Sequence, residues 1–339
     1  MPVVKVNLGR RSYPVAIGAG ASNKLPEYLK AKVVQNRVFV FYDAQFYALH
    51  GRRVSRYIKQ VVRPVELVLP RGERVKSATQ VKRLYSYLLG QKVSLADFIL
   101  ACGGGVTSDL IGYVAATSMR GIQWGVLSTT LLGMVDASIG GKTAINHPGG
   151  KNLIGAFWQP SFVISDTDYL LTLARKEVTA GLGEVVKYGG LAAEPILDRL
   201  DDYLSAGNCY DVVALNRLVL PCARYKAAVV SKDEREGGPR MLLNLGHTFS
   251  HAIESATRAL SHGEALPIGL LAACYLSTAL EPSRQNRLAG YLRLLERFLQ
   301  LVPHRRIDVA AARQAMTLDK KRRGSAPKFI LLDKPGKPI

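Results

Sequence analysis

Short hydrophobic runs alternate with longer amphipathic segments through the first half of the chain. The runs at 37–43, 65–70 and 97–102 are rich in β-branched and aromatic residues, as strands are. Helical spacing follows the first of these to about residue 60 and returns in the LYSYLL segment before the third. This alternation predicts a parallel sheet with helices on both faces. Residues 1–18 alternate hydrophobic and polar positions like a further strand.

The pattern changes after residue 174, where alanine- and leucine-rich segments with helical spacing follow one another. These segments cover 176–192, 210–234, 246–256 and 266–280. We therefore expect an α/β N-terminal domain with a Rossmann-like parallel sheet (1–174), then an all-α C-terminal domain (175–339) with one possible late strand at 328–333. A chain of 339 residues exceeds the size of a single core, which agrees with two domains.

Composition places the chain among folded, soluble proteins. Hydrophobic residues make up 48% and charged residues 21%, without a low-complexity tract. No apolar run is expected to span a bilayer and the N-terminus does not resemble a secretory signal, so we expect a cytoplasmic protein without a membrane partner. Four widely spaced cysteines without CxxC pairing indicate buried free thiols.

The net charge of +20 raises the possibility of nucleic-acid binding. The basic residues are scattered, however, and no recognition helix, zinc finger or aromatic RNA-binding signature accompanies them. We expect no specific nucleic-acid partner. Anionic small molecules and solvated surface account for the charge.

Three of the six histidines lie between residues 242 and 264. His247 and His251 stand at i and i+4 on one predicted helix face, and His262 follows His247 by fifteen residues (262 − 247). Glu184 in GEVVKYG would add a carboxylate from an earlier helix. Imidazoles, one carboxylate and an open position suit a catalytic divalent ion such as zinc. The alternative to a metal site is that His247 and His251 share a helix face by chance and that His262 only caps a helix.

A glycine-rich turn follows the strand that ends at Cys102. Glycines there allow backbone amides to approach a phosphate, and the following helix N-terminus favours negative charge. A tight turn without a ligand is the alternative. Candidate nucleotide contacts at other strand ends, each of which can also be ordinary capping chemistry, are Asp43, Glu73, Lys76, Asp109, Thr129, Thr130 and Leu132.

Cations and glycines crowd together between residues 120 and 152, in a mixture that suits a phosphate-bearing substrate. The residues concerned are Arg120, Asp136, Lys142, Lys151 and Asn152. A second cationic group, formed by Lys187, Lys226 and Arg240 with Asn244, borders the proposed metal. Two cationic groups beside a metal suggest a substrate with two anionic ends. A nicotinamide and a metal together suggest oxidation of an alcohol.

With these residues assembled, the chain resembles the 3-dehydroquinate synthase family. The motifs are GGGVTSDLIGYVAATSMRG, STTLLGMVDASIGGKTAINHPGGKNLIGAFWQP, GLGEVVKYG, DEREGGPRMLLNLGHTFSHAIE and HGEALPIG, and the resemblance covers residues 37–334. It departs from the family pattern at Ser118, Ala174 and Ser250, none of which removes a charged or ligand residue.

The resemblance implies a carbon-oxygen lyase that uses NAD and one divalent metal ion, zinc or cobalt. It would convert 3-deoxy-D-arabino-heptulosonate 7-phosphate into 3-dehydroquinate and phosphate in the shikimate pathway of aromatic amino acid biosynthesis. The steps are transient oxidation at C5, β-elimination of phosphate, re-reduction, ring opening and an intramolecular aldol reaction. No net redox change results, and the family implies a homodimer.

The resemblance also implies residue roles. The metal ligands would be Glu184, His247 and His262, with His251 as a proton-transfer or phosphate-facing group. The phosphate would be held by Lys142, Asn152, a lysine of the DKK motif taken as Lys320, and Arg120 from across the dimer interface. The carboxylate and ring hydroxyls would be held by Lys187, Lys226, Arg240 and Asn244. The nucleotide contacts would be Asp43, Glu73, Lys76, Gly104, Gly105, Val106, Asp109, Thr129, Thr130, Leu132, Asp136, Lys142, Lys151 and Thr172.

Two enzyme classes compete with this hypothesis. Other sugar-phosphate cyclases share the cofactor and the metal but differ in pocket residues. A metal-dependent polyol or glycerol-phosphate dehydrogenase would share the glycine-rich turn and the metal, lack the lysine array and produce NADH from an alcohol.

Overall fold

The computed structural model describes residues 1–33, 36–207, 211–257, 260–303, 306–323 and 328–339, with the side chains of 317–323 left aside. Contacts divide the chain into two compact units. The first comprises Met1–Leu173 and Lys226–Arg235, and the second comprises Ala174–Tyr225 and Glu236–Ile339. The sequence pattern does not predict that Lys226–Arg235, near the end of a helix, joins the first unit.

A seven-stranded sheet forms the first unit, in the order β1-β2-β9-β6-β5-β3-β4. All neighbours are parallel except β1 and β2, which pair antiparallel. The strands are β1 (Val3–Val6), β2 (Tyr13–Gly18), β3 (Val38–Asp43), β4 (Val65–Leu69), β5 (Phe98–Gly103), β6 (Gln123–Ser128) and β9 (Val163–Asp166). The predicted Rossmann-like sheet is therefore confirmed.

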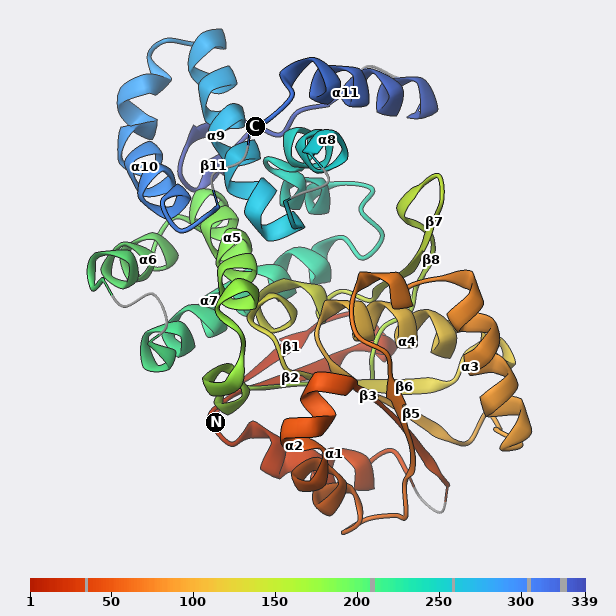
Figure 1. Ribbon diagram of the computed structural model, residues 1–339. Helices are drawn as coiled ribbons and strands as arrows, with labels where there is room; N and C mark the ends of the chain where they lie inside the picture. The colour runs from red at the N-terminus through yellow and green to blue at the C-terminus, as the bar shows by residue number, and fades with distance from the viewer. Residues whose placement is uncertain (34–35, 208–210, 258–259, 304–305, 324–327) are drawn as a thin grey trace. The chain divides into compact units, whose positions relative to one another are not determined.

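Helices cover both faces of this sheet (Figure 1). They are α1 (Leu25–Lys30) and α2 (Ala44–Ile58) on one face, and α3 (Ala78–Gly90) and α4 (Gly105–Thr117) on the other. Strand β3 shows why a layer of helices forms on each face of the sheet, because its side chains are buried on both faces. Val38, Val40 and Tyr42 join the core under α2, and Phe39 and Phe41 are buried on the opposite face.

The glycine-rich segment after residue 140 forms an antiparallel hairpin of β7 (Lys142–His147) and β8 (Gly150–Phe157), which the hydrophobic pattern did not indicate. Alternating Thr143 and Ile145 pack inward, so a period of two is present beneath the glycines.

The second unit is helical. Its helices are α5 (Arg175–Ala192), α6 (Ile196–Ser205), the first part of α7 (Val212–Lys232), α8 (His247–Thr257), α9 (His262–Leu280), α10 (Arg284–Leu299) and α11 (Val309–Arg323). The late strand exists in shortened form, since β10 (Leu332–Lys334) pairs with β11 (Lys337–Pro338). The predicted helical C-terminal half is confirmed.

Helix α9 contradicts the expectation that no apolar stretch can span a bilayer. By length and composition alone, His262–Leu280 is long and apolar enough to cross a membrane. Within the second unit, however, α9 packs against α5, α8 and α10. That packing is typical of a core helix, which passes the same test.

Candidate functional site

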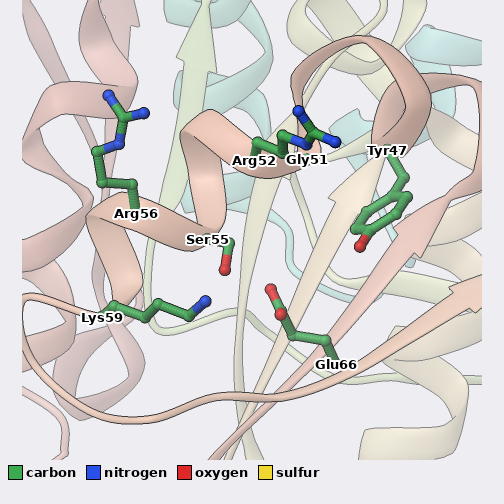
Figure 2. Close-up of a pocket in the computed structure, with 7 residues that line it drawn as sticks. All are labelled: Tyr47, Gly51, Arg52, Ser55, Arg56, Lys59 and Glu66. Carbon is green, nitrogen blue, oxygen red and sulfur yellow. The ribbon is translucent and has the colours of Figure 1, made fainter.

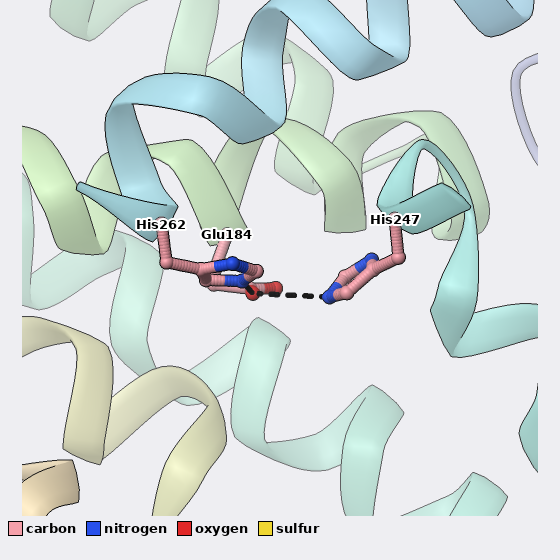
Figure 3. A group of neighbouring side chains, drawn as sticks. All are labelled: Glu184, His247 and His262. Carbon is pink, nitrogen blue, oxygen red and sulfur yellow. Dashed lines mark hydrogen bonds and ion pairs between the residues drawn. The ribbon is translucent and has the colours of Figure 1, made fainter. Parts of the chain in front are cut away.

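The Glu184 carboxylate and the imidazoles of His247 and His262 lie together in the second unit (Figure 3). One ligand atom from each lies within 4.8 Å of the others. The Nε2 atom of His262 is 3.2 Å from Glu184 Oε1, and His247 Nε2 is 3.8 Å from the same oxygen. Two imidazole nitrogens and one carboxylate oxygen form the donor set of a catalytic zinc site. The group therefore fits one divalent ion.

Two glycines explain how α5 and α9 bring these side chains together. A Cβ on Gly183 would lie 2.3 Å from Gly263 O, and one on Gly263 would lie 2.1 Å from Ala180 O. The two helices thus meet backbone to backbone at residues that directly adjoin Glu184 and His262. A capping box formed by Ser261 and Glu264 fixes where α9 begins.

Hydrogen bonds behind the imidazoles orient both rings. His247 Nδ1 is 3.2 Å from Leu245 O, and His262 Nδ1 is 2.8 Å from Glu254 Oε1. Both Nε2 atoms consequently face Glu184, as Figure 3 shows. Sequence reasoning missed Glu254. The signal was its spacing, because it follows His251 by three residues on the same helix.

The two imidazoles of the group differ in charge at neutral pH. Burial and the nearby Lys187 lower the pKa of His247 to about 3, so its imidazole is neutral at pH 7. Burial alone would lower the pKa of His262, but the hydrogen bonds that its ring donates to Glu184 and Glu254 outweigh this effect and raise the pKa to about 9. His262 therefore holds a proton between two carboxylates, where a cation would replace it.

Lys187 is buried beside the same carboxylate. Its Nζ lies 2.5 Å from Glu184 Oε2 and 4.8 Å from the centre of the Tyr188 ring. One helical turn separates the two charged residues on α5, as the sequence predicts. This ion pair places a fixed positive charge next to the metal group.

Other predicted residues of the second unit lie around or near this group. The His251 ring is 5.5 Å from that of His247 and, with Glu254 and His262, forms a second possible ligand group. Arg240 is buried in the short helix η7 (Pro239–Asn244), and Asn244 donates to Glu236 at 2.7 Å. Lys320 falls on α11, and its side chain lies outside the described residues.

In the first unit, Lys76 joins residues that the sequence assigns to two different ligands. Its buried Nζ lies 2.7 Å from Asp109 Oδ2 and 2.5 Å from Asn152 Oδ1. Asp109 is a predicted nucleotide contact, whereas Asn152 is predicted to hold phosphate. Asn152 also takes a left-handed backbone conformation, with φ of 54°. Spacing along the chain gives no signal for this contact, because the hairpin brings Asn152 back to α4.

Several predicted nucleotide residues share the edge where the parallel strands end. Asp43 ends β3, Gly104 and Gly105 follow β5, and Thr129 and Thr130 follow β6. No described side chain caps the N-terminus of α4, which leaves its backbone amides available to a phosphate. A Cβ on Gly104 would lie 2.7 Å from Thr130 Cγ2. The alternative role of Asp43 is also present, since it caps α2 through Gln45 and Phe46.

Remaining residues of the predicted set occupy several places in the first unit. Lys142 and Lys151 are exposed on the hairpin, Val106 is in the first turn of α4, and Leu132 precedes the short helix η5 (Gly133–Ala137). Asp136 and Lys226, predicted to serve different ligands, form an ion pair at 2.9 Å.

Two of these residues have surroundings that the sequence did not indicate. Thr172 lies 2.7 Å from His50 Nε2, and His50 was not predicted. Arg120 and Met119 both have positive φ, 65° and 50°, in consecutive non-glycine positions. Such backbone is strained and occurs often at functional sites.

Comparison with known proteins identifies the family. The 3-dehydroquinate synthase N-terminal family matches residues 66–180, and the C-terminal family of the same name matches residues 181–322. The 3-dehydroquinate synthase of Halorhodospira halophila is 40% identical over 334 residues, covering 96% of this chain and 92% of that protein.

Solved structures agree with this result. A 2-deoxy-scyllo-inosose synthase complexed with carbaglucose-6-phosphate, NAD+ and Co2+ has a TM-score of 0.89 at 25% identity, covering 100% of this chain and 94% of the other. The 2-epi-5-epi-valiolone synthase of Streptomyces hygroscopicus, with NAD+ and Zn2+ bound, has a TM-score of 0.85 at 25% identity, covering 96% and 91%. The chain belongs to the 3-dehydroquinate synthase family.

Proposed function

We propose that this protein converts 3-deoxy-D-arabino-heptulosonate 7-phosphate into 3-dehydroquinate and inorganic phosphate. The observation that carries the proposal is the group of Glu184, His247 and His262, which has the donors of a catalytic metal site in a chain with both halves of the family. When bound, NAD would accept and return a hydride at C5 of the sugar, and the metal ion would acidify the C5 hydroxyl.

The side chains of the second unit would hold the ion and the reacting end of the substrate. Lys187 keeps a positive charge beside Glu184, which suits the negative charge that develops when the proton next to the C5 ketone leaves. Arg240 and Asn244 are proposed to bind the carboxylate and ring hydroxyls, together with Lys226 of the first unit. His251, which neighbours two of the ligands, is proposed to move a proton or face the phosphate.

The side chains of the first unit would bind the nucleotide and the leaving group. The uncapped start of α4 and the adjoining strand ends, which include Asp43 and Thr130, are proposed to hold NAD. Lys142, Asn152 and Arg120 are proposed to bind the phosphate, together with Lys320 of the second unit. The NAD+ of the two similar structures and the carbaglucose-6-phosphate of the first support the binding of a nucleotide and a phosphorylated ligand.

The direct test is incubation with the heptulosonate phosphate, catalytic NAD and one divalent metal. We expect equal amounts of phosphate and 3-dehydroquinate and no net NADH. Net NADH from an alcohol substrate would instead identify a metal-dependent polyol or glycerol-phosphate dehydrogenase. Turnover of a different sugar phosphate only would identify another cyclase of the superfamily.

Substitution of Lys142 tests the phosphate assignment. Lys142→Ala should abolish phosphate release while NAD binding stays nearly unchanged, because Lys142 is exposed on the hairpin and not part of a core. Phosphate release is measured colorimetrically and NAD binding by fluorescence. Unchanged turnover would contradict the assignment.

The proposal includes a homodimer, in which Arg120 from one subunit completes the phosphate pocket of the other, and a soluble protein in the cytoplasm. A mixture of Arg120→Ala and Lys142→Ala subunits should regain part of the activity if Arg120 acts across the interface, since one of the two sites then keeps both residues. No recovery would mean that Arg120 acts within its own subunit.

A further inference from the structure

A cavity of about 390 Å3 lies between α2 and the edge strand β4, apart from every residue assigned to the nucleotide, the metal or the substrate. This volume is within the range of small-molecule sites. Its lining residues are Tyr47, Gly51, Arg52, Ser55, Arg56, Lys59 and Glu66. We call it the α2 pocket (Figure 2).

The hydroxyl group of Ser55, in the lining of the α2 pocket, has no evident role in stabilising the fold. The residue is 8% exposed, and its hydroxyl has no hydrogen-bond partner among the described residues. Figure 2 shows this hydroxyl directed into the space between Lys59 and Glu66. A buried hydroxyl without a partner is costly. A bound molecule would supply the partner.

The helix geometry places three cations along the same side of the pocket. Arg52, Arg56 and Lys59 follow one another at i, i+4 and i+7, so they share one face of α2 and its C-terminal end. Among the described residues, no salt bridge joins any of them to an acidic side chain. Three cationic side chains in the lining of one pocket favour an anionic occupant.

Glu66 adds a hydrogen-bond acceptor opposite these cations. One of its carboxylate oxygens accepts from the Tyr42 hydroxyl at 2.8 Å, which holds the side chain in place. Three cations and one carboxylate give the lining a net charge of +2 (3 − 1). This matches a phosphomonoester, whose charge at pH 7 is about −1.5 to −2. A simple anion would be repelled by Glu66, whereas a hydroxyl on the same molecule would donate to it.

Tyr47 forms the side wall, and Gly51 makes room for it. A Cβ on Gly51 would lie 2.4 Å from the Tyr47 ring. The ring therefore rests against the bare helix backbone, which a larger residue would prevent.

We propose that the α2 pocket is a second binding site, for a small phosphomonoester that also carries a free hydroxyl group. The phosphate lies against Ser55, Lys59 and the two arginines, and the hydroxyl donates to Glu66. The site is separate from the phosphate pocket of the proposed reaction, and its existence does not depend on that reaction.

The test measures binding of radiolabelled glycerol 3-phosphate to the full-length protein by equilibrium dialysis. All proteins carry Lys142→Ala, which weakens the proposed active-site phosphate pocket. Adding Arg52→Ala and Lys59→Ala should lower the affinity at least about tenfold, because each lost charged contact is worth on the order of a factor of ten. The matched control adds Lys82→Ala and Arg83→Ala, an exposed pair on α3, and should leave the affinity unchanged.

Two single variants separate ligand binding from folding. Ser55→Ala should raise Tm in the absence of ligand, because it removes a buried unpartnered hydroxyl, and should still weaken glycerol 3-phosphate binding about tenfold. Glu66→Ala should reduce the preference for glycerol 3-phosphate over inorganic phosphate. The proposal is overturned if the Lys142→Ala protein binds no glycerol 3-phosphate, or if the Arg52 and Lys59 substitutions change its binding no more than the α3 control. These results leave the product assay of the proposed function unaffected.

Discussion

The two units hold their candidate ligand groups by different means. In the second unit, Glu184 and His262 are pressed together because α5 and α9 touch at Gly183 and Gly263. In the first unit, the candidates lie at strand ends, in a hairpin and at a helix start, where backbone amides and a network around Lys76 hold them. The metal group thus depends directly on core packing, whereas the strand-end group depends on local turns. Substitutions at the contact of α5 with α9 should affect folding and metal binding together, whereas substitutions in the first unit should separate folding from binding.

The largest effect is expected where packing and ligand geometry coincide. Gly263→Ala adds a Cβ that would lie 2.1 Å from Ala180 O, so α5 and α9 must move apart. We expect destabilisation of about 3 kcal/mol or more, together with loss of zinc measured by elemental analysis.

The matched control for this change is Gly290→Ala in α10. A Cβ there meets only the end of the Arg293 side chain, at 4.0 Å, and alanine favours a helix. This variant should keep its zinc and its Tm or gain slightly. Equal behaviour of the two variants would refute the coupling of packing and metal binding.

The next effect concerns the buried ion pair. Glu184→Ala should lose the metal and also destabilise the protein by about 3–5 kcal/mol, since Lys187 would be left buried without its carboxylate. The double variant with Lys187→Met should regain stability but not zinc. A Glu184→Ala protein that keeps stoichiometric zinc by elemental analysis would exclude Glu184 as a ligand.

A smaller effect is expected behind the metal group. Glu254→Gln keeps a hydrogen bond to His262 Nδ1 but removes the carboxylate charge. Zinc affinity, measured by competition with a chelator, should fall about 10- to 100-fold, with little change in Tm. An unchanged affinity would show that Glu254 does not support His262.

The smallest effect concerns Asp97 at the start of β5, away from the strand ends that carry the nucleotide candidates. Burial would raise the pKa of Asp97, but hydrogen bonds from Arg37 and Ser94 outweigh it and lower this pKa below its usual 3.8. The carboxylate therefore stabilises the fold at neutral pH, and this contribution is lost as the pH falls below about 3.8 and through the lower folded value.

Asp97→Asn should cost about 1–2 kcal/mol at pH 7 and progressively less towards pH 3, as followed by urea unfolding at each pH. NAD binding at pH 7 should be unchanged. A loss of stability that does not depend on pH would attribute the effect to packing and not to the charge.

The strand and helix pattern of both units followed from local sequence. Buried strands such as 37–43 and amphipathic helices carry their periodicity in consecutive residues, because each element is defined by short-range geometry. The hairpin of β7 and β8 was missed since its glycines masked an alternation visible in Thr143 and Ile145. The sequence pattern also did not indicate that α9 has the length and apolar composition of a membrane-spanning helix.

The sequence alone determined the residue types of the metal group, the glycine-rich start of α4 and the family motifs, because each is a set of chemical groups at fixed spacing. The contact of α5 with α9, the Glu254 bond behind His262, the meeting of Lys76 with Asn152 and the unpartnered Ser55 came from the folded chain. The first three are contacts between residues whose separation along the chain does not predict that they meet. The fourth depends on which polar groups are buried away from water when the chain folds. Chain packing, and not residue order, fixes such distances.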